Sequence, residues 1–569
     1  MKLLLVICVC TLAHCQPCVK ITEGELCGTT YTLPNNRQVF VYYGIPFAAP
    51  PIGENRFKNP QPVVGWNGVR NATVRGPECV QFIRKSEETP VKGDEDCLYL
   101  NVFTPKILAA NSSELMNVLV YIHGGAFMYG SGKNMNPDYI MQNDDIVFVS
   151  INYRLGPLGF LSTSDLIVPG NNGLKDQVVA LEWIHKNIRN FGGDPKSVTI
   201  YGVSAGAACV HYHMITRIFY NEMLFRSHHP INRTMANPDL FQKAISASGA
   251  AGFPWSLRPY TWSKSLELAE ILKCENGDSS YILNCLRNKT IEEIYRATCI
   301  LLEGKHDTDI PFGPVLEPFH HNSFLSHNPI YELEDSHVND IPWMISVVDR
   351  EGTVPGIAIV SNSTFFNSLD EKWDELAPDM FLYNNNSLLE KPGSEIGSLI
   401  KKHYFGDRKI SNDTIDELFR ALGDRLFYHP VTKVTKLHNS VVKNNVYCYR
   451  FKYRGSESFS DYHPGKENYG VCHCDDQFYI VSWNGRRKNQ LDDQMAKFLS
   501  SSIIAFMKTG NPSTPLVNWE PVSKDDEMRC LNIYSPTDQK MENFENKTML
   551  QFWENILRKK AGNRGPINF

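Results

Sequence analysis

One serine of this chain stands in a context that could make it a nucleophile. Residues 202–206 read GVSAG, which matches the pattern G-x-S-x-G. A serine hydroxyl is a weak nucleophile at neutral pH, so it needs an exposed position and an adjacent base. A sharp turn between a strand and a helix exposes the serine, and small flanking residues let the backbone pack closely there. Because glycine is common, the pattern indicates a nucleophile at Ser204 only together with its surroundings.

A pair of glycines follows an apolar run earlier in the chain. Residues 123–127 read HGGAF and come directly after the apolar residues 118–122. Acyl transfer passes through a tetrahedral oxyanion, which backbone N–H groups stabilise from a fixed position. Glycines leave such amides accessible to a substrate. The segment is therefore typical of an oxyanion hole, and a plain glycine turn is the alternative.

His473 is the best candidate for the base among the 17 histidines. It comes after the Ser204 motif and after an expected strand, which is the usual order in serine hydrolases of this type. Cys472 and Cys474 flank it and suggest a metal site as the alternative. A structural zinc site takes four ligands in paired spacing, and the sequence offers no matching second pair. We therefore expect neither a metal nor a cofactor.

Two acidic residues could orient this base. Asp349 and Glu351 follow the apolar residues 343–348, where a loop at the end of a strand would present them. A carboxylate in that place would hold the imidazole in its productive tautomer. Composition and position alone do not separate the two candidates.

These distant segments need a scaffold that brings them together. Apolar runs rich in β-branched residues alternate with helical patterns, which predicts a mainly parallel sheet covered by helices. The expected core strands are 118–122, 146–152, 198–201, 343–348 and 446–453, and apolar residues recur at helical spacing from Leu174 to Ile188. Residues 215–340 look irregular, and we expect them to cap the sheet. No linker, repeat or charge block divides the chain, so the sequence predicts one α/β domain over residues 16–569.

The composition excludes some partners. The 569 residues carry a formal net charge of −5 and are 42% hydrophobic, which allows a large core. This mild negative charge gives no reason to expect a nucleic-acid partner. No stretch after the N-terminus reaches the roughly 18 to 20 apolar residues of a membrane span.

The N-terminus and two residue counts point to secretion. Lys2 precedes an apolar run over residues 3–12, and Ala13 and Cys15 follow at the spacing of a signal-peptide cleavage site. We expect a signal peptide over residues 1–15. Its removal leaves 12 of the 15 cysteines, an even number that suits an oxidising compartment. Eight N-x-S/T glycosylation sequons are present, at Asn71, Asn111, Asn232, Asn288, Asn362, Asn385, Asn412 and Asn546.

Taken with further segments, these motifs resemble the cholinesterase/carboxylesterase family, the type-B esterases of the α/β-hydrolase fold. The further segments are YGIPFA at 43–48, EDCLYLNV at 95–102, NYR at 152–154, GLKDQ at 173–177, FGGDP at 191–195 and AIS at 244–246. They run through most of the mature chain, and together they are highly specific. Residues 202–207 and 471–476 are most similar to those of secreted insect carboxylesterases.

The resemblance implies a role for each candidate. Its acid is a glutamate, so the implied catalytic triad is Ser204, Glu351 and His473. The implied oxyanion hole consists of the amides of Gly124, Gly125 and Ala205.

The resemblance also implies supporting residues. Trp255 would line the acyl pocket and Ser248 would place a hydroxyl near the acid, unless each is a plain core residue. Implied structural pairs are the disulfides Cys79–Cys97 and Cys274–Cys285 and the ion pairs Arg56–Glu95 and Arg154–Asp176. The short spacing of Cys18 and Cys27 adds a third expected disulfide. Cys472 and Cys474 should remain thiols, because a bridge there would distort the loop that carries His473.

Two departures from the cholinesterases narrow the substrate. Those enzymes carry an acidic residue just before the nucleophile, and this chain has Val203. They also place a cation-binding tryptophan inside the first disulfide loop, where residues 79–97 offer only Phe82 as an aromatic. A quaternary ammonium would lose its cation–π partner, so we expect uncharged small-molecule esters as substrates. The alternatives are a juvenile hormone esterase, although the glutamine typical of those enzymes is absent at position 203, a lipase-like esterase, or a non-catalytic binding protein of the same fold.

Overall fold

The structure is a computed structural model that describes residues 16–82, 91–108, 112–215, 239–258, 261–275, 277–302, 310–383, 388–462, 468–482 and 489–560. The expected signal peptide and the sequons at Asn111, Asn232 and Asn385 lie outside these residues.

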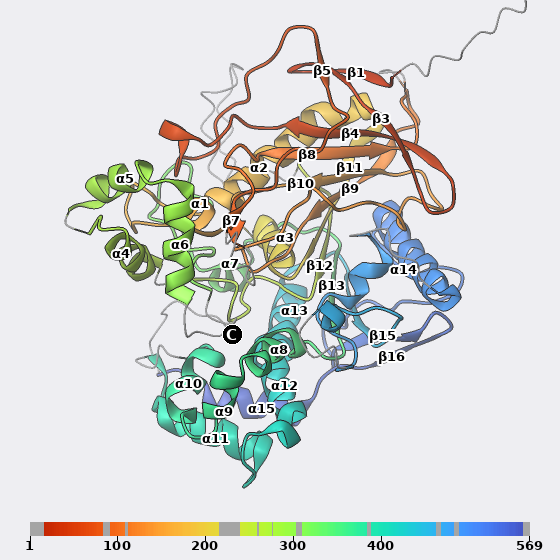
Figure 1. Ribbon diagram of the computed structural model, residues 1–569. Coiled ribbons are helices and arrows are strands. Elements are labelled where there is room, and N and C mark those ends of the chain that lie inside the picture. The colour runs from red at the N-terminus through yellow and green to blue at the C-terminus, as the bar shows by residue number, and fades with distance from the viewer. Residues whose placement is uncertain are drawn as a thin grey trace, which may run out of the picture.

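An eleven-stranded sheet runs through the centre of the molecule (Figure 1). Strands β10, β9, β11, β12, β13, β14 and β15 form its parallel middle, and antiparallel strands complete both edges. In spatial order the strands are β16 (Asp538–Asn543), β15 (Arg529–Ser535), β14 (Val446–Phe451), β13 (Trp343–Val348), β12 (Lys243–Ala247), β11 (Gly193–Val203), β9 (Met116–Ile122), β10 (Val147–Ile151), β8 (Tyr99–Thr104), β4 (Gln38–Pro46) and β3 (Thr29–Thr32). Two small sheets flank it, one of β1 (Cys18–Ile21), β2 (Gly24–Cys27) and β5 (Val69–Asn71), the other of β6 (Gln81–Phe82) and β7 (Val91–Lys92).

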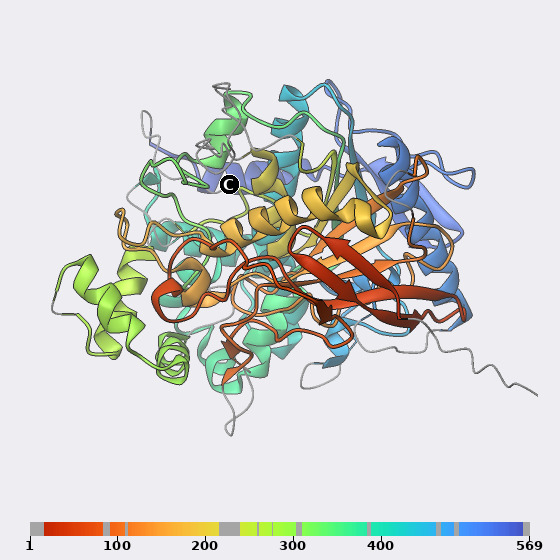
Figure 2. The same ribbon diagram turned by 90° about the horizontal axis from the view of Figure 1, so that it is seen from above.

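Helices cover both faces of this sheet, as the two ribbon views show (Figures 1 and 2). Helices that follow strands directly include α3 (Ala205–Ile215) after β11 and α8 (Thr353–Ser361) after β13. The others are α1 (Gly156–Phe160), α2 (Asn172–Asn187), α4 (Thr261–Ile271), α5 (Ser279–Arg287), α6 (Ile291–Leu302), α7 (Pro329–Glu334), α9 (Ser363–Ser368), α10 (Trp373–Met380), α11 (Gly393–Phe405), α12 (Ile415–Gly423), α13 (His429–Val441), α14 (Gln490–Thr509) and α15 (Lys547–Ile556).

The two faces of the sheet bury two hydrophobic clusters. In β9, Val118, Val120 and Ile122 face the larger cluster, whereas Leu119 and Tyr121 face the smaller one. This alternation follows from the two-residue period of a strand. Residues of α14 pack in the smaller cluster, and residues of α2, α3, α12 and α13 pack in the larger one. Both clusters pack against the middle strands and so hold the carboxyl ends of these strands in fixed positions.

The α/β-hydrolase architecture confirms the predicted fold, but one part of the sequence prediction was wrong. Residues 215–340 are not irregular, because their described part contains α4 to α7 and the central strand β12. In α6, for example, Ile294, Tyr295 and Leu301 are buried at helical spacing. Figure 2 shows α4, α5 and α6 as a lobe that protrudes from the rest of the molecule.

Four disulfides are present in the structure. Cys18–Cys27, Cys79–Cys97 and Cys274–Cys285 are the three pairs expected from the sequence. The fourth, Cys448–Cys530, was not foreseen, and it joins the adjacent strands β14 and β15. Its two cysteines are 82 residues apart, so only the pairing of the strands reveals the bridge.

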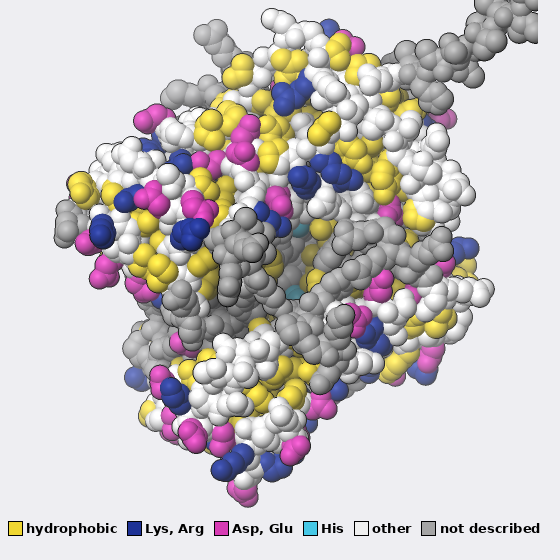
Figure 3. Space-filling view, in the orientation of Figure 1, with side chains coloured by type: hydrophobic (Ala, Val, Ile, Leu, Met, Phe, Trp, Pro, Cys, Tyr) yellow, Lys and Arg dark blue, Asp and Glu magenta, His cyan; other side chains and the backbone are white. Residues whose placement is uncertain are grey.

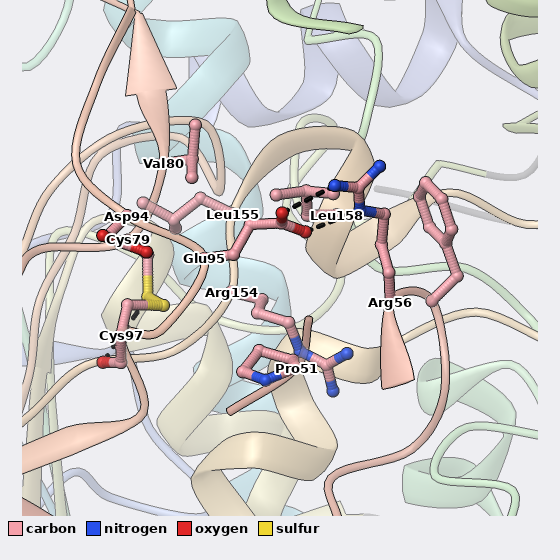
Figure 4. Close-up of a pocket in the computed structure, with 11 residues that line it drawn as sticks. Pro51, Arg56, Cys79, Val80, Asp94, Glu95, Cys97, Arg154, Leu155 and Leu158 are labelled. Carbon is pink, nitrogen blue, oxygen red and sulfur yellow. Dashed lines mark hydrogen bonds and ion pairs between the residues drawn. A yellow bond between two sulfur atoms is a disulfide. The ribbon is translucent and has the colours of Figure 1, made fainter. Parts of the chain in front are cut away.

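Both implied ion pairs lie close together beneath the first disulfide loop. Arg56 makes two 2.6 Å contacts with Glu95, and the buried Arg154 lies 2.7 Å from Asp176. Figure 4 shows Arg56, Glu95 and Arg154 around a small hollow next to the Cys79–Cys97 disulfide. None of the expected triad residues lines this hollow.

Among the described residues, no helix is both long and apolar enough to cross a bilayer. Cys18, Glu25 and Cys27 form the one described group with the spacing of three metal ligands, but its two cysteines form a disulfide.

Candidate active site

Ser204 lies on a strained turn between β11 and α3. Its φ of 56° is in the left-handed region, which is unusual for a residue with a Cβ and is found at functional turns. The neighbouring glycines make the turn possible. A Cβ at Gly202 would lie 2.2 Å from the carbonyl oxygen of Gly206, and a Cβ at Gly206 would lie 2.2 Å from that of Ile122. The turn therefore lifts the Ser204 side chain above the carboxyl end of the sheet, where it is partly exposed.

The strands next to β11 bring the other candidates to the same edge. Strands β11, β12, β13 and β14 are consecutive neighbours, so the residues that follow them lie side by side. The Ser204 N–H donates to the Ala247 carbonyl at 2.8 Å, and the Ser248 N–H donates to the Ser346 carbonyl at 2.9 Å. Ser248 thus lies between the turn after β11 and the loop after β13. Its hydroxyl is buried and has no hydrogen-bond partner among the described residues.

Glu351 and His473 form a buried pair at this edge. The Nδ1 atom of His473 lies 2.5 Å from Oε2 of Glu351, and the other carboxylate oxygen accepts the Val348 N–H at 2.9 Å. Glu351 is fully buried and His473 is 5% exposed. A carboxylate on Nδ1 leaves Nε2 of the imidazole as the atom that can accept a proton.

The alternative acid, Asp349, points elsewhere. It lies 2.9 Å from Arg450 and 3.6 Å from Lys452, both of which are partly exposed. Position in the sequence did not decide which of the two acids orients His473. In the structure Glu351 contacts His473, whereas Asp349 binds two cations of β14 and the segment after it.

The loop that carries His473 is tied to the loop that carries Glu351. The Arg350 N–H donates to the Val471 carbonyl at 3.0 Å, and the Thr353 hydroxyl donates to Sγ of Cys472 at 3.0 Å. Cys472 and Cys474 are free thiols, and burial raises the pKa of both well above the usual range of a cysteine. They therefore act as small apolar residues that let the loop pack into the core.

The glycine segment after β9 packs against Ser204. A Cβ at Gly124 would lie 2.6 Å from the Val203 carbonyl oxygen and 3.1 Å from Cβ of Ser204. Gly125, Ala126 and Phe127 all have positive φ angles, of 108°, 53° and 58°. Two of these three residues are not glycines, so the backbone is strained at this point.

The side chain of His123 holds this segment in place. Nδ1 of His123 donates to the Gly124 carbonyl at 2.8 Å, and the ring stacks on Tyr153 with centroids 4.3 Å apart. Burial lowers the pKa of His123 to about 4, so it stays neutral and serves as a structural donor rather than as a base.

Three amides near Ser204 are available to a ligand. Within the described residues, the N–H groups of Gly124, Gly125 and Ala205 have no hydrogen-bond acceptor. Ala205 is the first residue of α3, and the first amides of a helix have no partner inside the helix. The positive end of the helix dipole also favours negative charge there. These amides are the donors that an oxyanion would need.

Aromatic side chains form a wall beside His473. The Phe427 ring lies 5.0 Å from the His473 ring and 5.9 Å from that of Trp255. Trp255 donates from Nε1 to the Leu426 carbonyl at 3.1 Å, and a Cβ at Gly249 would lie 2.9 Å from its ring and 2.5 Å from the Ser204 carbonyl oxygen. Trp255 therefore lies beside Ser204.

Phe427 was missed from the sequence. It belongs to a short π-helical segment, Asp424–Tyr428, between α12 and α13. No pattern in the sequence predicts a π turn, although such turns are frequent at functional sites.

The space-filling view shows a hollow near the centre of this face of the molecule, with histidine side chains visible inside it (Figure 3).

Comparison with known proteins agrees with this geometry. The profile described as "Carboxylesterase family" matches residues 15–553. The chain belongs to the carboxylesterase family. This esterase is 35% identical to a carboxylic ester hydrolase of Bombus ignitus, over 95% of this chain and 94% of the relative. It is 34% identical to venom carboxylesterase-6 of Apis mellifera, again over 95% and 94%.

A solved structure extends the comparison to the fold. The juvenile hormone esterase from Manduca sexta, crystallised with OTFP covalently attached, superposes with a TM-score of 0.81 at 26% identity. The match covers 95% of this chain and 99% of the other. The protein is therefore an ester hydrolase with the α/β-hydrolase fold of that enzyme.

Proposed function

We propose that this esterase is a secreted serine carboxylesterase that hydrolyses uncharged carboxylic esters through Ser204, His473 and Glu351. The observation that carries the proposal is the buried Glu351–His473 pair at 2.5 Å, at the edge of the sheet where Ser204 stands on its positive-φ turn. A nucleophile, a base and the group that orients the base are the three parts that acyl transfer from serine requires.

The proposed reaction has two steps. His473 takes the proton of the Ser204 hydroxyl through Nε2 while the serine oxygen attacks the ester carbonyl. Glu351 holds the imidazole in the required tautomer and stabilises the imidazolium. His473 then gives the proton to the leaving alcohol, and an acyl-enzyme forms. Water repeats the sequence and releases the acid and the free serine.

The surrounding groups support both steps. The amides of Gly124, Gly125 and Ala205 would bind the oxyanion of each tetrahedral intermediate. Trp255 and Phe427 would hold the acyl chain, because the Trp255 ring lies beside Ser204 and the Phe427 ring contacts the rings of Trp255 and His473. Ser248 would place its unpartnered hydroxyl between the nucleophile turn and the loop of the acid.

The preference for uncharged esters rests on the residues around the nucleophile. Val203, which precedes Ser204, is 3% exposed and packs in the smaller hydrophobic cluster. Phe82, the one aromatic of the 79–97 loop, is also buried. Neither residue offers the negative charge or the open indole face that would attract a quaternary ammonium.

Secretion and glycosylation complete the proposal. Residues 1–15 would be removed as a signal peptide, leaving a single domain over residues 16–569. The disulfides support an oxidising compartment. The five described sequon asparagines are exposed, so each could carry a glycan: Asn71, Asn288, Asn362, Asn412 and Asn546.

The test compares kcat/KM for butyrylthiocholine with kcat/KM for an uncharged butyrate ester of similar leaving-group reactivity. Two lost contacts of about 0.5 to 2 kcal/mol each predict a preference of about five- to thousand-fold for the uncharged ester. Equal or higher efficiency on the choline ester would overturn the preference and leave the triad standing. The catalytic proposal would be overturned if the protein hydrolysed neither of these esters nor any ester with a longer acyl chain.

A second candidate substrate is a juvenile hormone ester. The superposition with the Manduca sexta enzyme favours it, whereas Val203 in place of glutamine weighs against it. A juvenile-hormone-like methyl ester in the same panel decides between the two, because only a dedicated enzyme should prefer it over butyrate.

A further inference from the structure

Asp475 lies two residues after His473 and is 2% exposed. In the described part of the chain it makes no ion pair, although burying a carboxylate without a counter-charge is costly. Its two oxygens instead accept backbone N–H groups. Oδ2 accepts from Cys472 at 2.7 Å, and Oδ1 accepts from Phe459 at 2.8 Å.

The hydrogen bonds of Asp475 hold the backbone on both sides of His473, the proposed base. Cys472 precedes His473, and its carbonyl accepts the N–H of Asp475 at 3.0 Å. Cys472 and Asp475 thus exchange two hydrogen bonds across His473 and Cys474. Cys474 takes a φ of 72°, which closes the turn. The bond to Phe459 fixes this turn to the segment Phe459–Tyr462, so the backbone of His473 cannot shift alone.

Both amides that Asp475 accepts need a partner. A buried N–H group left without an acceptor costs about 1 to 3 kcal/mol. A neutral amide side chain offers one acceptor oxygen, and its NH₂ group would face an N–H donor. Only a carboxylate of this length satisfies both, which explains why the fold retains a buried acid here.

We propose that Asp475 is the positioning residue of His473: its ionised carboxylate fixes the backbone on both sides of the imidazole, so that Nε2 faces Ser204. The inference rests on the proposed function of His473 as the base. Glu351 sets the tautomer and the ring plane through Nδ1, and Asp475 sets where the ring is attached. Glu351 therefore orients the His473 ring directly, and Asp475 positions the backbone that carries it.

Charged and titratable groups around Asp475 act on its ionisation in opposite directions. Burial raises the pKa of Asp475 to about 7, and the hydrogen bonds from Phe459, Ser458 and Cys472 oppose this rise, with a smaller opposing effect from Arg454. Arg454 itself is paired with Asp461 at 2.9 Å. Among the described residues, Cys472, Cys474 and Tyr479 are further titratable groups that interact with Asp475.

The test is Asp475→Asn, with kcat and KM measured on an uncharged butyrate ester at pH 8. A misplaced base slows the chemical step without weakening ground-state binding, and a displacement of about 1 Å costs up to 10²-fold. We expect kcat to fall by about 10- to 100-fold while KM changes less than about twofold.

The matched control is Asp492→Asn. Asp492 is 1% exposed and accepts hydrogen bonds from the hydroxyl groups of Tyr453 and Tyr479. Its replacement therefore removes a buried carboxylate, as Asp475→Asn does, but one that makes no hydrogen bond to the described residues next to His473. It should lower the melting temperature and leave kcat within about twofold. A kcat for Asp475→Asn within twofold of the wild type, or an equal loss in both variants, would overturn the inference.

A second variant covers the case in which Asp475→Asn is not recovered folded. Asp475→Glu keeps the charge but moves the carboxylate by one methylene, and it should lower kcat by about fivefold or more at unchanged KM; an unchanged kcat contradicts the inference. Labelling of wild-type Ser204 by an organophosphate separates the two proposals. An unlabelled wild type would refute the proposed function as well, whereas a labelled wild type with normal variants would refute the role of Asp475 alone.

Discussion

Replacing Gly124 with alanine should remove most of the activity while the protein still folds. An added Cβ would lie 2.6 Å from the Val203 carbonyl oxygen and 3.1 Å from Cβ of Ser204. Ordinary contact begins near 3.4 Å, so the methyl group must move by roughly 0.8 Å from the first of these atoms. The first obstacle belongs to β11 and the second to Ser204, and neither can rotate away. The segment after β9 must therefore yield.

That displacement would carry the amides of Gly124 and Gly125 away from the oxyanion. Loss of one oxyanion donor costs about 10²- to 10³-fold in kcat, or about 2.7 to 4 kcal/mol. We expect this loss in kcat for an uncharged butyrate ester, with KM changed only slightly.

The control for this prediction is Gly397→Ala in α11. There the nearest atom is the Tyr383 hydroxyl oxygen at 3.0 Å, and no candidate site residue is near. Its kcat should match that of the wild type. A Gly124→Ala variant with kcat within threefold of the wild type would refute the assignment of these amides to the oxyanion hole.

Three further outcomes follow from the same geometry. Glu351→Gln should lower kcat by about 10⁴-fold with KM nearly unchanged, because a neutral amide cannot fix the tautomer of His473; steady-state kinetics that show less than a tenfold loss contradict this role. Phe427→Leu should raise the ratio of kcat/KM for decanoate over butyrate esters by about tenfold, since a smaller side chain opens the acyl pocket; an unchanged ratio places the acyl chain elsewhere. Between about pH 5 and 6, the unfolding free energy of the wild type relative to Asp475→Asn should fall by about 1.4 kcal/mol per pH unit as pH rises, which urea titrations measure.

The sign of the last prediction follows from the raised pKa. The unfolded chain ionises Asp475 near its ordinary value of 3.8, whereas the folded protein keeps it protonated up to a pKa of about 7. The folded state therefore binds the proton more tightly. This stabilisation is fully present below the unfolded pKa and is lost as pH rises through the folded one. A flat difference across this range would show that Asp475 is already ionised in the fold.

Local patterns were sufficient for the central strands and for Ser204 and His473 of the candidate triad. The β-branched runs at 118–122 and 343–348 lie within β9 and match β13, because parallel strands buried on both faces are continuously apolar. The order of strand ends also explains why Ser204, Glu351 and His473 could be grouped. Each follows one of four neighbouring strands of the sheet.

Features that depend on tertiary packing could not be predicted in this way. The helices between residues 261 and 302 are short and amphipathic, and within their lobe α6 contacts the small strands β6 and β7. Phe427 meets His473 only because a π turn rotates it there, and Cys448 meets Cys530 only because β14 and β15 pair. Local patterns likewise did not separate Glu351 from Asp349; the family resemblance favoured Glu351, and the contacts with His473 and Arg450 agree with that choice.

The central claim is that Ser204 is the nucleophile of this esterase, and stoichiometric labelling with an organophosphate tests it most directly. The label should reach one equivalent per protein, and hydrolysis should fall in proportion to the label incorporated. Peptide mass mapping should find the adduct on Ser204 alone, and the variant Ser204→Ala should take up none. Label on another serine, or full inactivation of hydrolysis without label on Ser204, would contradict the account.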